Sequence, residues 1–143
     1  MALIVQKYGG SSVANGELIK SVAHRVAKAR DEGNQVVVVV SAMGDTTDEL
    51  IKLAHQVAEQ PDDRELDVLL STGEIISSTL LAMALEDLGY KAVSLTGAQA
   101  GIQTDSSYSQ ARILRVDPKR IVNELEKGNI VIVAGFQGVT PNM

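Results

Sequence analysis

The sequence has no cysteine and no tryptophan, and its only aromatic residues are one phenylalanine and three tyrosines. The absence of cysteine excludes disulfides, thiolate zinc sites and a cysteine nucleophile. With so few aromatic side chains, the interior must be built mainly from Val, Ile, Leu and Ala. At 143 residues, with 45% hydrophobic and 22% charged residues, the chain can bury such a core as one domain. An aliphatic core of this kind is typical of a parallel sheet covered by helices.

Basic charge is also scarce. Thirteen Lys and Arg stand against eighteen Asp and Glu, which gives a net charge of −5. This balance argues against a nucleic-acid partner, because binding to a phosphate backbone usually requires a basic face. The N-terminus has no apolar signal segment, and we see no stretch that approaches the 18 apolar residues of a membrane span. We therefore expect a cytoplasmic protein with no nucleic-acid or membrane partner.

Strand-like and helix-like segments alternate along the chain. Strands are expected over residues 3–8, 35–42, 91–97 and 130–135. Five consecutive valines at 36–40 indicate a central strand that is buried on both faces. Gly33, Gly89 and Gly128 each end a helical segment shortly before a strand, as in the short connections of βαβ units. The pattern predicts an α/β fold, a three-layer αβα sandwich with a mostly parallel sheet and right-handed crossovers.

Short-range signals predict the first two helices. Asn15 is the expected N-cap of the first helix, which closes at Gly33. Its expected buried face is formed by Leu18, Ile19, Val22, Val26 and Ala29. Thr46 and Glu49 have the spacing of a capping box for the second helix. The expected buried stripe of that helix is formed by Leu50, Leu53, Ala54 and Val57.

The second half of the chain carries further signals of the same kind. A long helical pattern covers residues 64–88, with an interruption or kink expected at 71–73. Residues 101–116 read as two short β segments around a polar tip, which predicts a hairpin. Asp117 is the expected N-cap of a last helix, with Pro118 at its first position.

Four Gly-, Ser- and Thr-rich stretches follow the predicted strands. They are KYGGSS from residue 7, SAMGDTT from residue 41, SLTGAQAG from residue 94 and AGFQG from residue 134. Ligands of open α/β sheets bind beyond the carboxyl ends of the strands, so these stretches should meet at one edge. Glycine allows the main chain to approach a ligand closely, and the hydroxyls can bind it. We expect the functional site at this edge.

The first of these stretches suggests a phosphate site. Gly9 and Gly10 could form an anion nest whose N–H groups point at phosphate oxygens. Lys7, on the strand, would add a positive charge beside them. The alternative is a turn next to a lysine that reaches solvent, and the pattern leaves both open.

Three further residues are candidates for binding an anionic or amino-acid ligand. Ser41 ends the valine-rich strand, and Thr47 lies at the start of the next helix, where N–H groups favour anions. Glu74 lies in an otherwise apolar helix and could accept a hydrogen bond from a ligand ammonium. For the loop at residues 41–47 the alternative is ordinary helix capping, which accounts for Thr46 but not for Ser41 or Thr47. For Glu74 the alternative is a glutamate on the helix surface or in its N-terminal turn. His24 and His55 read as surface residues, and no metal-ligating cluster is visible.

Several of these stretches occur in an order that resembles aspartate kinase, in the amino-acid kinase superfamily. They are KYGGSS, VVVVSAMGDTTDEL, LLSTGEIIS, SLTGAQAGIQTD with a following ARI, and VAGFQGV. The resemblance implies phosphoryl transfer from MgATP to the side-chain carboxylate of L-aspartate. The product, 4-phospho-L-aspartate, opens the biosynthesis of lysine, threonine and methionine. The resemblance also implies a homo-oligomer in the intact enzyme.

The resemblance also implies roles for individual residues. Lys7 would stabilise the transferring phosphoryl group, and the following residues would contact ATP phosphates. These residues are Tyr8, Gly9, Gly10 and Ser11. Ser41, Thr47 and Glu74 would hold the aspartate, and no residue is expected to bind a metal directly.

The resemblance covers residues 1–143 as the amino-acid-binding lobe of such a kinase. An Arg-Gly-Gly-Ser-Asp segment, the nucleotide-binding half and the regulatory ACT domains, which follow in the family, are absent from this sequence. We therefore expect a fragment that is inactive alone. Two alternatives remain: another amino-acid kinase, acting on glutamate, acetylglutamate, carbamate or a nucleotide, or a non-catalytic binding or assembly module.

Overall fold

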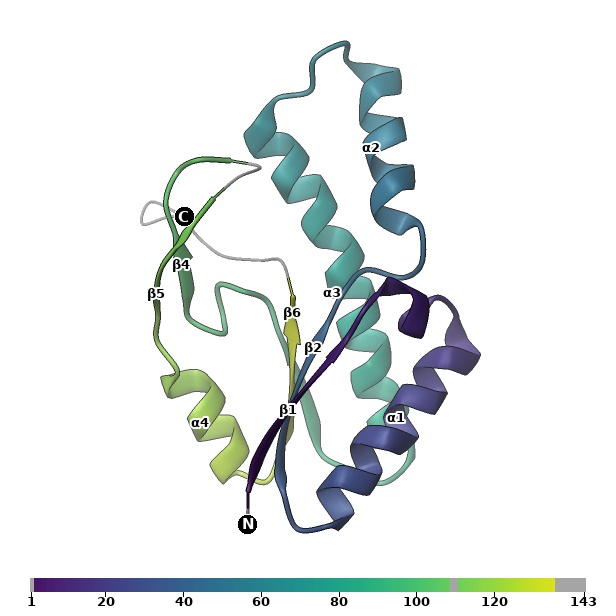
Figure 1. Ribbon diagram of the computed structural model, residues 1–143, viewed down its shortest axis with the longest axis vertical. Coiled ribbons are helices and arrows are strands. Elements are labelled where there is room, and N and C mark those ends of the chain that lie inside the picture. The colour runs from purple at the N-terminus through teal and green to yellow at the C-terminus, as the bar shows by residue number, and fades with distance from the viewer. Residues whose placement is uncertain (1, 109–110, 136–143) are drawn as a thin grey trace.

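A parallel sheet of four strands forms the centre of the computed structural model, which describes residues 2–108 and 111–135. The strand order is β1-β2-β6-β3, and every neighbouring pair is parallel. The strands are β1 (Leu3–Tyr8), β2 (Gln35–Val40), β3 (Ala92–Leu95) and β6 (Ile130–Ala134). The predicted α/β architecture is therefore confirmed (Figure 1).

Helices cover both faces of this sheet. On one face lie α1 (Gly16–Asp31) and α3 (Asp63–Asp87), and on the other lies α4 (Lys119–Glu126) (Figure 1). The valines of β2 alternate between the two layers, since Val36 and Val38 pack with α1 and α3 whereas Val37 packs with α4. Successive side chains of a strand point to opposite faces, and helices cover both faces here, so the whole valine run is apolar.

Both ends of α1 lie where the local sequence predicts them. The Asn15 side chain caps the helix by accepting a hydrogen bond from the N–H of Leu18 at 2.9 Å. Gly33 then adopts a φ of +91°, the left-handed conformation that glycine favours at a helix end. The predicted face is buried except for Leu18, which is 38% exposed.

Two predictions for α2 (Thr46–Val57) are wrong. The capping box does not form: Asp45 is the N-cap, no side chain caps the helix, and the N–H of Thr46 bonds to the carbonyl of Met43 instead. Of the predicted stripe only Ala54 is buried, whereas Leu53 and Val57 are 51% and 81% exposed. The reason is that α2 packs on α3 and stands away from the sheet (Figure 1).

The long helix α3 runs through residues 71–73 without a break, so the predicted interruption is wrong, and the kink given as its alternative stays a prediction. The hydroxyls of Ser71 and Thr72 bond to carbonyls three residues earlier in the helix, which accommodates these polar residues without a break. By length and mean hydropathy, 1.7 over its most apolar window, α3 is the one described helix that could span a membrane. It contains an apolar stretch longer than we expected, but it packs against α1, β3 and β6 like a core helix.

The predicted hairpin is present as β4 (Ile102–Thr104) and β5 (Ile113–Val116), paired antiparallel with an irregularity between Gln103 and Thr104. The Asp105 carboxylate accepts hydrogen bonds from the N–H groups of Ser107 and Arg112, which lower its pKa. The last helix begins one residue later than predicted: Pro118 is the N-cap, and the Asp117 carboxylate accepts from the N–H of Lys119.

Gly101 is expected to be indispensable for stability. Its φ is +86°, and a methyl group added there would overlap the main chain of Asp117, whose N–H donates to the Gly101 carbonyl. Gly101→Ala should therefore lower the free energy of unfolding by about 3 kcal/mol or more, measured by urea denaturation.

Gly128→Ala is the matched control for this prediction. Gly128 has the same φ of +86°, but an added methyl group there meets nothing within 4 Å. It should cost only about 1–2 kcal/mol, the strain of a left-handed alanine. Equal losses in the two variants would contradict the proposed clash.

Candidate functional site

Segments from three strands and two helices meet at the carboxyl edge of the sheet. The N–H of Ser41 bonds to the carbonyl of Tyr8 at 3.1 Å, which ties the end of β2 to that of β1. The N–H of Gly135 bonds to the carbonyl of Val40 at 2.9 Å, which adds the end of β6. The structure thus brings the predicted stretches at residues 7, 41 and 134 together. Residues 136–138 of the last stretch lie outside the described residues.

Lys7 and Tyr8 point to opposite faces of the sheet. Lys7 is exposed and lies opposite Val39 of β2. Tyr8 is only 9% exposed and packs in the core with Val13. Burial raises the pKa of the Tyr8 phenol, against a smaller opposite effect of Arg25, so the hydroxyl stays protonated and donates to Gln6. A ligand at this edge could therefore meet Tyr8 only through its main chain.

The two glycines of the first stretch differ in their surroundings. Gly9 has an extended conformation (φ −78°), and an added methyl group there would meet nothing within 4 Å. Gly10 begins a short 3-10 helix, η1 (Gly10–Val13), and a methyl group there would come within 3.0 Å of the carbonyls of Ala42 and Gly44. Neither glycine has a positive φ, so a nest of alternating hand does not form. The open main chain at Gly9 still allows close approach of a ligand.

The loop between β2 and α2 packs directly on η1. The N–H of Gly44 donates to the carbonyl of Gly10 at 2.9 Å. Ser41 is half-buried at the start of this loop, and Thr47 is exposed in the first turn of α2. The hydroxyl-bearing residues therefore surround the end of β2, next to the main chain that follows Lys7.

Glu74 is buried, which the sequence left open. It lies on the inner face of α3 with 5% of its surface exposed. One carboxylate oxygen lies 3.4 Å from the position that a Gly135 Cβ would occupy, so the side chain reaches the end of β6. This burial is inconsistent with the alternative of a surface glutamate and places the carboxylate beside the strand ends where the site is expected.

The loop after β3 is held by hydrogen bonds between its own residues. The side chains of Thr96 and Gln99 accept hydrogen bonds from each other's main-chain N–H groups, at 3.3 and 3.0 Å. These polar groups are thus used within the loop. This makes the third stretch a weaker candidate for binding than the first two.

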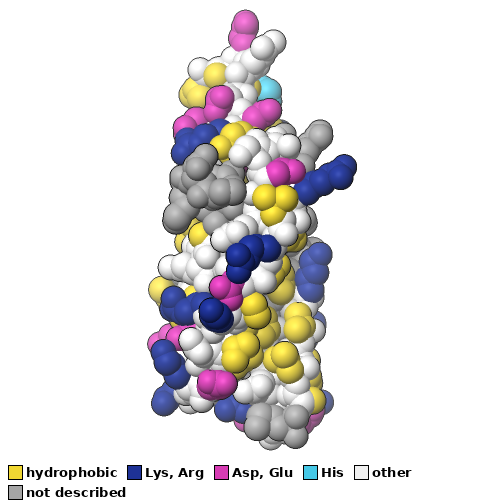
Figure 2. Space-filling model, turned by 90° about the vertical axis from the view of Figure 1, so that its left-hand side faces the viewer, with side chains coloured by type: hydrophobic (Ala, Val, Ile, Leu, Met, Phe, Trp, Pro, Cys, Tyr) yellow, Lys and Arg dark blue, Asp and Glu magenta, His cyan; other side chains and the backbone are white. Residues whose placement is uncertain are grey.

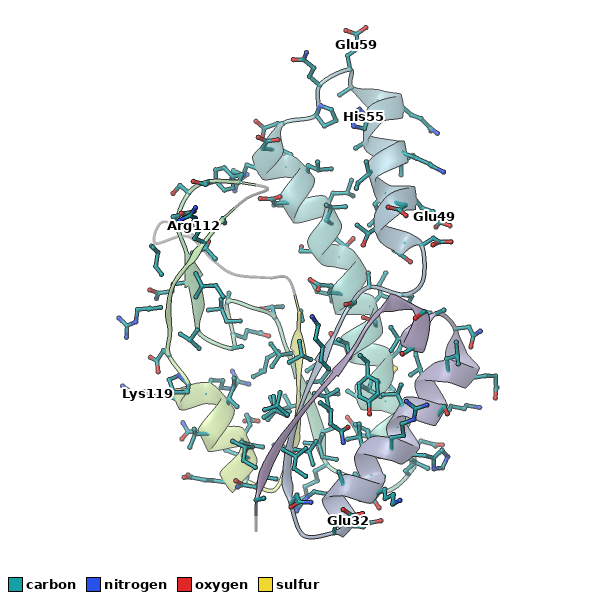
Figure 3. The ribbon with its side chains drawn as sticks, in the orientation of Figure 1. Glu32, Glu49, His55, Glu59, Arg112 and Lys119 are labelled. Carbon is teal, nitrogen blue, oxygen red and sulfur yellow. The ribbon has the colours of Figure 1, made fainter. Side chains whose placement is uncertain are left out.

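The remaining candidates lie away from the strand ends. His24 and His55 are exposed as predicted, and Figure 3 shows His55 on the outer part of α2, far from the sheet. Among the described residues no three His, Asp or Glu side chains are grouped as metal ligands. A shallow depression of about 370 Å³, lined by residues including His24, Asp31 and Tyr90, lies at the amino ends of the strands. The two histidines and this depression therefore lie away from the carboxyl edge, where the predicted site residues meet.

The open side of the site lies at β1. Leu3 and Val5, on the same face of β1 as Lys7, are 58% and 63% exposed. Figure 2 shows apolar side chains gathered on the lower half of the face that lies on the left in Figure 1. The edge strand that carries Lys7 is thus uncovered within the described residues.

Sequence reasoning missed Ser77. Its side chain is fully buried, and its hydroxyl donates to the carbonyl of Ser41 at 2.6 Å. The available signal was a pair of serines, Ser77 and Ser78, in an otherwise apolar helix. The pattern did not show which of them faces the loop.

The profile of the Amino acid kinase family matches residues 2–143, and the chain belongs to this family. It is 59% identical over 140 residues to an aspartokinase of Geobacillus stearothermophilus and 54% identical to aspartokinase 2 of Bacillus subtilis. Each alignment covers 98% of this chain and 34% of the relative. The chain therefore spans about a third of the length of these curated relatives.

Solved structures agree with the family assignment. The crystal structure of aspartate kinase from Synechocystis matches with a TM-score of 0.82 and 47% identity, over 96% of this chain and 22% of that one. Aspartokinase III of E. coli, solved with aspartate and ADP, matches with a TM-score of 0.79. At 19% identity over 99% of this chain and 42% of the other, that match shows the fold alone.

Proposed function

We propose that this chain is the amino-acid-binding lobe of an aspartate kinase, which transfers the γ-phosphoryl group of ATP to the side-chain carboxylate of L-aspartate. The observation that carries the proposal is the meeting of Lys7, Ser41 and Glu74 at one sheet edge. A cation, a hydroxyl and a buried carboxylate suit a phosphate and an amino acid bound side by side. The aspartokinases that match at 54–59% identity support the choice of substrate.

Lys7 and the residues after it are assigned to the phosphates of ATP. The Lys7 ammonium would stabilise charge on the transferring phosphoryl group. The accessible main chain at Gly9 suits contact with phosphate oxygens, together with Gly10 and Ser11 at the start of η1. Tyr8 would take part through its main chain, because its ring is in the core.

Ser41, Thr47 and Glu74 are assigned to L-aspartate. The buried Glu74 carboxylate would accept a charge-assisted hydrogen bond from the substrate ammonium. The Ser41 and Thr47 hydroxyls, with the first turn of α2, would bind a substrate carboxylate. These contacts would fix the substrate so that its side chain faces Lys7.

The chemistry requires positioning and charge neutralisation. An oxygen of the substrate carboxylate forms a bond to the γ-phosphorus of ATP while the bond from that phosphorus to the bridging oxygen breaks, which releases ADP. The carboxylate is already ionised at neutral pH, so no protein base and no protein nucleophile is needed. The polar groups at this edge fit such a reaction.

Mg²⁺ would be bound mainly through the phosphates of ATP. Mg²⁺ keeps several waters and is often held by substrate phosphates with one or two carboxylates. We assign no residue of this chain as a metal ligand.

The remaining assignments concern the intact protein. We propose a cytoplasmic homo-oligomer without nucleic-acid or membrane partners, acting at the first step of lysine, threonine and methionine biosynthesis. The acidic net charge supports the absence of a nucleic-acid partner. The outer face of α3 supports self-association, because Ile76 and Met83 are 49% and 63% exposed there. Sedimentation of the full-length gene product measures the oligomeric state.

Product trapping tests the proposed activity. The full-length gene product is incubated with MgATP and L-aspartate, and the acyl phosphate is captured with hydroxylamine while ADP is measured in parallel. We expect equal amounts of hydroxamate and ADP that depend on aspartate. Parallel reactions contain L-glutamate, N-acetyl-L-glutamate or carbamate. Product formation with one of these and not with aspartate would assign another amino-acid kinase. Aspartate binding without turnover would assign a binding module.

A further inference from the structure

Helix α3 approaches the loop after β2 unusually closely through two small residues one turn apart. A methyl group added at Gly73 would lie 2.9 Å from the Ala42 Cβ and 3.3 Å from the Thr46 Cγ2. One turn further along the helix, the Ser77 side chain faces the same loop and is completely buried. The small side chains therefore set the distance between α3 and the loop that carries Ser41 and Thr47.

The Ser77 hydroxyl makes a bond that crosses between elements. It donates to the Ser41 carbonyl at 2.6 Å, and the Glu74 carbonyl in its own helix lies further away, at 3.1 Å. The N–H of Ser41 is bonded to the carbonyl of Tyr8. Both main-chain groups of Ser41 are thus held, one by β1 and the other by α3. Breaking the bond from Ser77 would leave the Ser41 carbonyl without this partner.

The neighbouring serine shows that this geometry is specific. Ser78 is also buried, at 3% exposure, but its hydroxyl donates to the carbonyl of Ile75 at 3.1 Å. That bond stays within α3 and touches no residue of the site. The two serines therefore differ in what they connect, although they are almost equally buried.

We infer that Ser77 is a positioning residue of the amino-acid site. This inference rests on the proposed function, in which Ser41 and Glu74 bind the same substrate. Ser77 lies one turn from Glu74 and bonds to Ser41, so its hydroxyl holds the two binding residues at a constant separation. It does so from inside the core and touches no substrate itself.

Ser77→Ala and Ser78→Ala in the full-length gene product test the inference. With Ser77→Ala we expect the KM for aspartate to rise by roughly two- to ten-fold, the worth of one hydrogen bond, while kcat changes by less than about two-fold. Ser78→Ala should leave both constants at their original values. The Tm of each variant, measured in parallel, shows whether the two changes cost similar stability.

Hydrogen exchange without substrate provides a readout independent of activity. In Ser77→Ala, we expect the N–H groups of Ser41, Gly44 and Thr46 to exchange roughly two- to ten-fold faster than in the original protein. In Ser78→Ala they should exchange at the original rate. These three N–H groups belong to the loop and bond to the carbonyls of Tyr8, Gly10 and Met43, so their exchange reports on the position of the loop.

The two measurements separate the inference from the proposed function. If the original protein has no aspartate-dependent turnover, the proposed function fails, and exchange alone decides whether Ser77 holds the loop. Equal exchange rates in the two variants would overturn the inference. So would faster exchange in Ser77→Ala with an unchanged KM for aspartate in an active enzyme.

Discussion

Replacing Lys7 by alanine in the full-length gene product is expected to lower kcat by on the order of 10²- to 10³-fold, as removal of a group that stabilises transition-state charge does. Lys7 is the only cationic residue of β1, and its strand ends where the accessible main chain of Gly9 begins. The proposed role concerns the transferring phosphoryl group. The KM for aspartate should therefore change far less than kcat. Steady-state kinetics with varied aspartate at saturating MgATP measures both constants.

Lys20→Ala serves as the matched control for this variant. Lys20 lies on α1, with its side chain 70% exposed and 3.8 Å from the Glu17 carboxylate. A surface pair of this kind contributes little to stability, so its loss should leave both kinetic constants unchanged. Turnover of Lys7→Ala equal to that of Lys20→Ala would refute the assignment of Lys7 to the phosphoryl group.

Replacing Glu74 by alanine is expected to raise the KM for aspartate by roughly 10- to 100-fold, the worth of a hydrogen bond between charged groups. The carboxylate is buried on α3 beside the end of β6, where it would bind the substrate ammonium. Glu74→Gln keeps the volume of the side chain and removes only its charge. It should therefore reproduce most of the effect on KM if charge recognition is the cause.

Glu124→Ala controls for the loss of a buried carboxylate as such. Glu124 is 6% exposed on α4 and accepts hydrogen bonds from Lys127 and Asn129, which tie the end of that helix to the turn before β6. Its removal should lower the free energy of unfolding and leave the KM for aspartate unchanged. An unaltered KM for aspartate in both Glu74 variants would remove Glu74 from the substrate site.

The predictions that succeeded depend on interactions within a few residues. Asn15 caps α1 because its side chain reaches the N–H of Leu18, three positions away. Gly33, Gly89 and Gly128 have left-handed conformations because a helix must turn back at once to reach the next strand. Interactions over so few residues can be predicted from the local sequence without knowledge of the tertiary structure.

The predictions that failed concern which neighbour covers a surface. The apolar stripe of α2 was visible in the sequence, but burial of Leu53 and Val57 needs an element packed against them. The capping box at Thr46 failed because the turn from Met43 already uses the N–H of Thr46. The spacing of hydrophobic residues identifies the apolar face of a helix, but it does not show which element packs against that face.

The candidate site likewise combines features that the local sequence predicted with features that depend on tertiary contacts. The sequence alone determined that Gly- and Ser-rich stretches follow parallel strands, so Lys7 and Ser41 had to meet at one edge. Only the tertiary structure decided that Glu74 is buried beside the end of β6, that the Tyr8 ring belongs to the core, and that Ser77 bonds to Ser41. The physical reason is that these contacts join residues far apart in the chain, and their distances depend on how closely α3 packs against the sheet.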